Sequence, residues 1–370
     1  MIAPQSLYIH WPFCPYRCHF CPFVALAGHD SYMEQYHNAL VAEIRAYARQ
    51  TTIELPIKTI FLGGGTPSTY PPHLLLDMFG TLKEEFDLDP SAEITLEVNP
   101  GTVTPEKVVA WKQAGINRLS IGVQSLQDTV LAGLNRHQSV RDVMTTLEYT
   151  SPFFDALSID LILGLPGVSS DDWKNTMRRV IEWPITHLSI YFLTIHEQTP
   201  LYYRVQTRTT IVPPDDEVMD LYLWTLDLLD EAGFERYEVS NFARKSPHKS
   251  YRSQHNMVYW DRKPYKGFGL GAWSFDGLVR SHNEKNLIEY CERASRDEPL
   301  TVFTETVTPY QVWFEQVMLS MRRAEGVSYA LLKKEIAEDF LKATVADLIA
   351  AGYAQQGTES LILTQKGLAV

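Results

Sequence analysis

Short apolar segments alternate with amphipathic segments through the first half of the chain, and this alternation restricts the fold to few classes. The apolar segments predict strands at Leu7–His10, Thr59–Leu62, Ile94–Val98, Arg118–Val123, Leu157–Leu163 and His187–Leu193. The amphipathic segments predict helices at Tyr32–Arg49, Pro72–Glu85, Pro105–Ala114, Val140–Thr150 and Asp171–Ile181. Strands that alternate with helices favour a parallel sheet with right-handed crossovers. We therefore expect an α/β fold, either an open doubly wound sheet or a partial barrel, and periodicity alone does not choose between them.

Glycines and polar residues follow several of these strands. Gly63-Gly64-Gly65-Thr66-Pro67 follows the second strand, Asn99-Pro100-Gly101 follows the third, and Gln124 follows the fourth. Asp160 lies within the fifth strand. Ligands of α/β proteins bind at the carboxyl ends of parallel strands. A run of such positions therefore predicts a ligand site at this edge, although glycine and proline also simply end strands.

The pattern changes beyond about residue 205. From about Thr308 the chain predicts three helices and a short hairpin around Gly357, an arrangement that resembles a winged helix. Its six basic residues are balanced by seven acidic ones, which does not favour DNA binding. We expect a core domain over residues 1–240, a connecting segment over 241–307 and a C-terminal domain over 308–370.

Charge and hydropathy limit the partners of this chain. Its formal charge of -12 argues against general binding to nucleic acid, which needs a basic surface. No apolar run approaches the length of about 20 residues that a membrane span requires. The N-terminus lacks the basic and apolar stretches of a signal peptide, so a cytoplasmic protein is expected.

Three of the four cysteines, Cys14, Cys18 and Cys21, lie in the loop HWPFCPYRCHFCPF with the spacing C-x3-C-x2-C. Three thiolates would leave one iron of a [4Fe–4S] cluster without a protein ligand. The amino and carboxylate groups of S-adenosylmethionine (SAM) can occupy that open position, and Gly63-Gly64-Gly65 would let the backbone approach the amino group. The alternative is a zinc site completed by His19 or His10.

The fourth cysteine, Cys291, lies in the helical pattern IEYCERA. We interpret it as an ordinary small side chain of a packed helix.

Several further segments match one family. The cysteine loop, GGGTPS, EVNPG, RLSIGVQS, LNRHQ, IDLILGLPG and HLSIYFLT together resemble radical-SAM proteins of the coproporphyrinogen dehydrogenase (HemN-like) group, and the resemblance runs from about Leu7 to the C-terminus. It implies a partial (β/α)6 barrel with a smaller C-terminal α+β region. It also implies SAM contacts at Tyr8, Phe20, Gly64, Gly65, Thr66, Glu97, Gln124, Arg136 and Asp160.

Two features resemble the HemW-type haem chaperones within this group. Coproporphyrinogen dehydrogenases carry a further cysteine two positions after the third, where this chain has Phe23. The sequence His255-Asn256-Met257-Val258-Tyr259-Trp260 resembles the H-N-x-x-Y-W haem motif of the chaperones. The resemblance implies haem binding through His255 and delivery of haem to recipient haem proteins. One departure is Pro22-Phe23, where the chaperones usually have Asp-Phe.

Other interpretations stay open at this point. His255 and Trp260 can simply fill a core beside the barrel. The basic residues Arg244, Lys245, His248, Lys249 and Arg252 can pair with haem propionates or form a solvated loop. The chain can also be a HemN-like enzyme, an oxidase or a methyltransferase, that acts on a porphyrin or another small molecule, or a haem-binding module whose cluster is only structural. We further expect a reducing electron donor as partner and leave a homodimer open.

Overall fold

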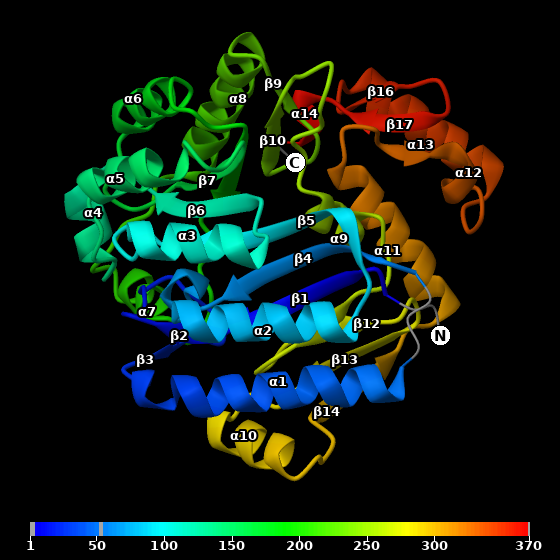
Figure 1. Ribbon diagram of the computed structural model, residues 1–370. Helices are drawn as coiled ribbons and strands as arrows, with labels where there is room; N and C mark the ends of the chain where they lie inside the picture. Colours follow the sequence, from blue (N-terminus) through cyan, green and yellow to red (C-terminus); the bar gives the residue numbers. More distant parts are fainter. Residues whose placement is uncertain (1–3, 52–54, 369–370) are drawn as a thin grey trace.

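The computed structural model describes residues 4–51 and 55–368, and a nine-stranded sheet with the order β11-β1-β4-β5-β6-β7-β8-β10-β9 forms its centre. The strands from β11 to β8 are parallel, and β10 and β9 continue the sheet in antiparallel pairing. Among the described residues the edge strands β11 and β9 do not pair with each other, so the sheet is an open partial barrel (Figure 1). The six predicted strands are confirmed. The sheet strands are β1 (Ser6–Trp11), β4 (Ile57–Gly64), β5 (Leu88–Val98), β6 (Arg118–Gln124), β7 (Ala156–Leu163), β8 (His187–Phe192), β9 (Phe234–Arg236), β10 (Asn241–Arg244) and β11 (Lys266–Phe268).

Helices cover one face of this sheet, and the predicted ones are confirmed to within a residue or two. Ser139 and Ser169 begin their helices with capping boxes, and Gly115 at φ 98° ends another in the left-handed conformation. Apolar strand residues such as Leu62, Leu119 and Ile159 pack against these helices in the main core. The helices are α1 (Met33–Gln50), α2 (Pro72–Glu85), α3 (Pro105–Ala114), α5 (Val140–Thr150), α6 (Ser170–Val180) and α8 (Asp215–Glu231).

The opposite face of the sheet is polar although it is buried. Side chains alternate across a strand, so the residues between the apolar ones point to this inner face. The inner face carries Thr59, Glu93, Thr95, Arg118, Ser120, Ser158 and His187, which are all buried. Buried polar groups need hydrogen-bond partners, so this inner face is where a network of polar contacts, or a polar ligand, is expected.

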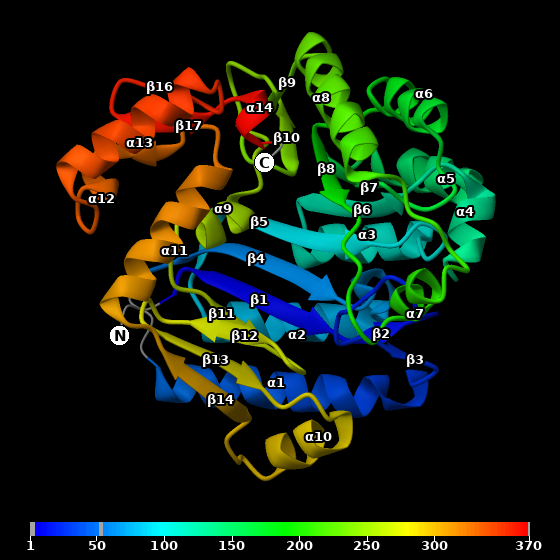
Figure 2. The ribbon, with the colours of Figure 1, turned by 180° about the vertical axis from the view of Figure 1, so that it is seen from behind.

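Several short elements lie outside the predicted pattern. They are α4 (Asp128–Gly133), α7 (Pro200–Gln206), α9 (Gln254–Trp260), α10 (Leu287–Ser295) and a small antiparallel sheet of β12 (Trp273–Phe275), β13 (Val279–Asn283) and β14 (Thr301–Thr306). Only α10 was anticipated, from the helical pattern around Cys291, and that cysteine is buried as expected. In Figure 2, α9 and α11 (Pro309–Arg322) lie near the end where β1 and β4 begin, and the small sheet lies beside β11.

The C-terminal segment has a small core of its own, built by Val327, Leu332, Leu341, Ala354 and Leu361. Three helices, α11, α12 (Tyr329–Leu332) and α13 (Glu338–Ala350), precede the hairpin of β16 (Ala354–Gln356) and β17 (Ser360–Leu363), which also pairs with β15 (Val327–Ser328). The short helix α14 (Gln365–Leu368) ends the described chain. This is the predicted content of three helices and a hairpin, while the domain boundaries stay predictions.

In the described part of the chain, no helix combines the length and apolar character needed to cross a membrane.

Candidate cofactor cavity

The cysteine loop begins at the carboxyl end of β1, as the sequence predicts. The short strands β2 (Phe13–Cys14) and β3 (Leu26–Ala27) pair in parallel and close the loop at its base. Thr66 joins this loop to the turn after β4, because its amide donates to the Phe13 carbonyl at 2.9 Å and its hydroxyl donates to Cys14 Sγ at 3.2 Å. The thiol loop and the glycine turn are therefore one structural unit.

The glycines of this turn are required by close packing. A Cβ at Gly65 would lie 2.5 Å from the Pro12 carbonyl oxygen, which is closer than Cβ atoms approach other atoms in proteins. Gly64 has φ 117°, and a Cβ there would lie 2.6 Å from the His10 ring. Glycine lets two backbone segments meet and leaves the Gly64 and Gly65 backbone at the wall of a cavity.

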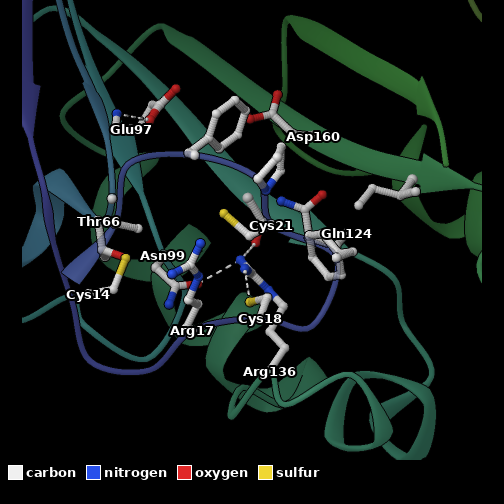
Figure 3. Close-up of a pocket in the computed structure, with 18 of the residues that line it drawn as sticks. Cys14, Arg17, Cys18, Cys21, Thr66, Glu97, Asn99, Gln124, Arg136 and Asp160 are labelled. Carbon is white, nitrogen blue, oxygen red and sulfur yellow. Dashed lines mark hydrogen bonds between the residues drawn. The ribbon is translucent and has the colours of Figure 1, made fainter. Parts of the chain in front are cut away.

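That cavity has a volume of about 450 Å³ and lies at the carboxyl ends of the parallel strands. Its size is typical of small-molecule sites. Figure 3 shows the three thiols in the same cavity as Glu97, Asp160 and Arg136. Eleven of the predicted site residues line it: Cys14, Cys18, Phe20, Cys21, Gly64, Gly65, Thr66, Glu97, Gln124, Arg136 and Asp160.

Arg136 is held from several sides. Its Nη2 donates to Asn99 Oδ1 at 2.7 Å and to the Gly122 carbonyl, and its Nη1 lies 3.5 Å from Cys18 Sγ. Its buried Nε has no hydrogen-bond partner among the described residues. A buried donor without a partner is costly, so the cavity wall offers a guanidinium N–H that a bound acceptor would satisfy.

Two carboxylates face the cavity without a cationic partner in the described part of the chain. Glu97 accepts a hydrogen bond from the Gly64 amide at 3.1 Å, and Asp160 accepts from Ser120 at 2.8 Å. Burial and the nearby Asp160 raise the pKa of Glu97 to about 8, and burial raises the pKa of Asp160. Such a pair favours a ligand that brings positive charge.

Gln124 adopts φ 66°, an unusual backbone conformation for a residue other than glycine. It ends β6 at an irregularity in the pairing with β7 and lines the cavity. Strained backbone is often found at ligand sites, where surrounding packing maintains it. The strain is consistent with a ligand contact at Gln124.

Both ring nitrogens of His10 and one ring nitrogen of His19 are engaged elsewhere. His10 uses both ring nitrogens, with Tyr8 Oη at 3.0 Å and the Val24 carbonyl at 2.8 Å, and burial lowers its pKa to about 4. His19 Nδ1 lies 3.1 Å from Arg204 Nη1. No group of three His, Cys, Asp or Glu residues in the described ranges is arranged to hold a single ion. In an iron–sulfur cluster each cysteine ligates a different iron, so its thiolates need not converge on one point.

Tyr8 and His255 do not line the cavity. Tyr8 is half-buried and hydrogen-bonds His10, while His255 is fully buried and bonds Thr59 of β4. His255 Nδ1 bonds Thr59 Oγ1 at 2.8 Å and Nε2 bonds Tyr259 Oη at 2.9 Å. Burial lowers the pKa of His255 to about 3.

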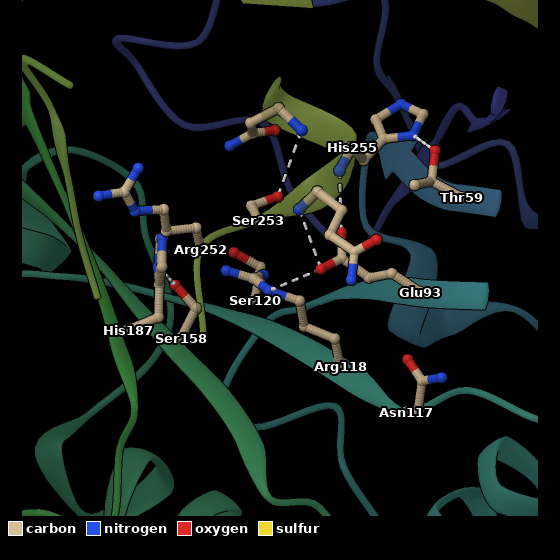
Figure 4. Close-up of polar contacts among 12 residues, drawn as sticks. Thr59, Glu93, Asn117, Arg118, Ser120, Ser158, His187, Arg252, Ser253 and His255 are labelled. Carbon is tan, nitrogen blue, oxygen red and sulfur yellow. Dashed lines mark hydrogen bonds and ion pairs between the residues drawn. The ribbon is translucent and has the colours of Figure 1, made fainter. Parts of the chain in front are cut away.

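The start of helix α9, which carries His255, is also held by hydrogen bonds to Glu93 of β5. Glu93 accepts hydrogen bonds from the amides of Gln254 and His255, both at 3.0 Å, and lies 3.9 Å from Arg118 (Figure 4). In this arrangement no ring nitrogen of His255 is free to ligate iron, and the side chain fills a core as the plainer interpretation expects.

Two cations of the basic segment before α9 form ion pairs within the protein. Arg252 forms ion pairs with Glu235 and Glu325, and Lys245 pairs with Asp230. No ion pair of Arg244, His248 or Lys249 is formed with the described residues, and the hypothesis that the segment holds haem propionates stays a prediction.

Sequence reasoning missed some cavity residues. Asn99 was noted only as a strand end, yet its Oδ1 accepts a hydrogen bond from Arg136 and so positions that side chain. Its Nδ2 donates to Tyr16 Oη at 2.8 Å. Ser120 orients Asp160, and Tyr191 lines the cavity from β8. The inward-facing alternation of β6 and β8 would have identified Ser120 and Tyr191, whereas nothing in the sequence pattern identifies Tyr16.

Comparison with known proteins shows the family of this chain. Residues 8–180 match the model of the Radical SAM superfamily. The chain is 32% identical to the haem chaperone HemW of Bacillus subtilis, over 98% of this chain and 96% of the relative, and 33% identical to HemW of Synechocystis sp., over 90% and 81%. The structure of the coproporphyrinogen III oxidase HemN from Escherichia coli superposes with a TM-score of 0.82 at 23% identity, covering 98% of this chain and 87% of the oxidase, and it supports the fold. The chain therefore belongs to the HemW-type haem chaperone family of the radical-SAM superfamily.

Proposed function

We propose that this protein is a cytoplasmic haem chaperone that binds a [4Fe–4S] cluster, SAM and haem, and that delivers haem to haem proteins. The observation that carries the first part is the meeting of three thiols, two buried carboxylates and an arginine whose Nε has no partner among the described residues, all in one cavity. The family name carries the second part, because HemW relatives are described as haem chaperones.

Cys14, Cys18 and Cys21 would hold the cluster. Burial raises the pKa of Cys14 to about 11 and also raises that of Cys21, so both thiols need a compensating cation to be bound as thiolates. The hydroxyl of Thr66 would keep its hydrogen bond to Cys14 Sγ. When bound together, the cluster and SAM supply one-electron cleavage of a carbon–sulfur bond.

SAM fits the charges of the cavity. Its carboxylate would satisfy the Arg136 Nε–H, and its ammonium and sulfonium would offset Glu97 and Asp160. The backbone of Gly64 and Gly65 forms part of the cavity wall. These residues bind and orient SAM, and Phe20 together with Ile162 makes part of the wall apolar.

Haem binding is proposed for the chain, with a reduced electron donor and a recipient haem protein as partners. His255 remains the ligand that the family resemblance implies, and its ligation would require α9 to release Thr59 and Tyr259. A HemN-like enzyme is the second candidate, favoured by the polar inner face of the sheet that adjoins the cavity.

Anaerobic reconstitution tests the proposal. About four irons per chain are expected, with an electron paramagnetic resonance signal that changes when SAM is added. Replacing any of Cys14, Cys18 or Cys21 by alanine should abolish the cluster, whereas Cys291→Ala is the matched control and should retain it. Stoichiometric binding of ferric haem and its transfer to an apo haem protein support the chaperone. Decarboxylation or methylation of a porphyrin without haem transfer supports the enzyme instead.

A further inference from the structure

The C-terminal segment is joined to both ends of helix α9 by charged side chains, and α11 lies beside α9 (Figures 1 and 2). Three ion pairs connect residues that flank α9 to α11 or to the loop after it, and we call them the ionic latch. They are Arg252–Glu325, Asp261–Arg323 and Arg262–Glu315. Arg252 precedes α9, whereas Asp261 and Arg262 follow it. The latch therefore holds the helix that carries His255 at its two ends.

The pair between Arg262 and Glu315 is the most buried part of the latch. The two side chains are only 9% and 14% exposed, and Arg262 Nε lies 2.8 Å from Glu315 Oε2. Arg280 of β13 also pairs with Glu315. Exposed ion pairs contribute little to stability, whereas separating a buried pair leaves charges without partners. This pair therefore fixes α11 against the end of α9 more firmly than a surface contact does.

Arg322 adds a contact with the last residue of α9. Its guanidinium lies over the Trp260 ring, 4.6 Å from the centroid, and its Nη2 lies 2.9 Å from Oε2 of the buried Glu238. Glu238 lies between β9 and β10, so Arg322 fastens α11 to the sheet independently of α9. Opening of the latch is therefore a separation of α9 from α11 while α11 stays attached to the core.

The closed latch also carries a cost. Arg322 Nε, Trp260 Nε1 and Arg262 Nη2 are buried and have no hydrogen-bond partner among the described residues. A buried donor without a partner is unfavourable, and water would satisfy these three donors once α9 separated from α11. The closed contact is thus stabilised by charge and destabilised by unmet hydrogen bonds. Opposing contributions of this kind favour an element with two accessible states.

His255 requires such an opening before it can ligate iron. Its two ring nitrogens are bonded to Thr59 and Tyr259, at 2.8 Å and 2.9 Å. The latch touches neither ring nitrogen, but α9 is only seven residues long, so movement of its ends displaces His255 with them. The latch therefore maintains the arrangement in which His255 is unavailable.

We propose that the ionic latch controls the access of haem to His255. With the latch closed, His255 stays bonded to Thr59 and Tyr259, and when α9 separates from α11 the imidazole is released for the iron. The inference rests on the proposed function, haem binding through His255. Haem would bind only the open state, so its apparent affinity is reduced by the fraction of chains that are open. Weakening the latch should therefore make haem bind faster and more tightly.

The test reverses one charge of the latch in the full chain with its cluster reconstituted. Arg323→Glu places a carboxylate opposite Asp261. It should increase amide hydrogen exchange over residues 254–260 and speed the association of ferric haem, followed at the Soret band, by roughly threefold or more. Asp261→Lys added to Arg323→Glu restores opposite charges and should return both values toward the parent.

The matched control is Lys342→Glu, which makes the same change of charge in an exposed pair with Glu338 on α13. It should exchange and bind haem as the parent does. Arg252→Gln is a second latch variant at a more exposed pair, and it should give a smaller change of the same sign, which keeps the test decisive if Arg323→Glu does not fold.

The remaining outcomes separate the inference from the proposed function. Unchanged exchange and unchanged haem association in the latch variants would overturn the latch. Faster exchange without faster haem association would show that the ion pairs only pack α9, and would overturn it too. If His255→Ala binds haem as the parent does, the inference fails while the chaperone proposal stands. If the parent binds no haem, the proposed function fails and the inference fails with it.

Discussion

The hydroxyl of Thr66 donates a hydrogen bond to Cys14 Sγ at 3.2 Å, which links the turn after β4 directly to a thiol of the cysteine loop. Two segments separated by fifty-two residues thereby share one site. Hydrogen bonds to cluster sulfurs stabilise the more negative, reduced cluster and so tune its reduction potential.

Thr66→Val is expected to lower the reduction potential of the cluster. Loss of one hydrogen bond of about 1 kcal/mol corresponds to a shift of roughly 20–60 mV. Spectroscopic redox titration of the reconstituted protein measures it. Thr66→Ser keeps a hydroxyl and should return most of the shift, and equal potentials in all three proteins would rule out the contact as a tuning element.

Arg136→Gln is expected to weaken SAM binding by roughly ten- to a hundredfold, because a charged hydrogen bond to the SAM carboxylate is lost. Isothermal titration of the anaerobic protein with SAM gives the affinity. Arg141→Gln changes an exposed arginine on α5 and serves as control. Identical SAM affinities for both variants would contradict the assignment of Arg136.

SAM affinity should rise with pH because of Glu97. Its folded pKa of about 8 lies above the ordinary value of 4.5, so below pH 8 the carboxylate is mostly protonated and offers no charge to the ligand cations. Binding should tighten by up to about 25-fold between pH 6.5 and pH 8.5. Glu97→Gln should flatten this dependence, and an unchanged slope in that variant would point to another group.

The same raised pKa affects the stability of the cofactor-free protein. A carboxyl group that is harder to ionise when folded stabilises the fold at low pH, and this contribution is lost as the pH rises from about 4.5 to about 8. The free energy of unfolding of Glu97→Gln should therefore depend less on pH over this window than that of the parent. Urea denaturation at several pH values makes the comparison.

Gly65→Ala is expected to destabilise the protein by about 2 kcal/mol or more, because the new Cβ would press on the Pro12 carbonyl oxygen at 2.5 Å. Gly80→Ala is the control, since a Cβ at that position in α2 meets nothing within 4 Å. It should stabilise the helix by about 0.5–1 kcal/mol. Chemical denaturation of the two variants should move the midpoint in opposite directions.

His255→Ala is expected to cost roughly 3 kcal/mol of stability even without haem, because it leaves a cavity and two unpaired hydroxyls, those of Thr59 and Tyr259. Thermal unfolding of the haem-free protein measures this. His29→Ala, at an exposed position, should change stability by no more than about 0.5 kcal/mol. A His255→Ala protein as stable as the parent would show that the packing around His255 is unimportant.

Local sequence patterns were sufficient to predict the strands of the sheet and most of the residues that line the cavity. The alternation of apolar and amphipathic segments predicted six parallel strands and their helices, because regular periodicity and capping residues such as Ser139 and Ser169 act within a few positions of each other. Polar groups at strand ends converge in any parallel sheet, so Glu97, Gln124 and Asp160 were predicted together.

Tertiary packing decided which side chains are buried and which partners they contact. The sequence alone places His255 near Tyr259 and Trp260, and only the fold shows that it is enclosed by Thr59, Tyr259 and Glu93. Asn99 and Tyr16 belong to the Arg136 site for the same reason. Burial and partner identity depend on which distant segments meet, and short-range patterns carry no information about such contacts.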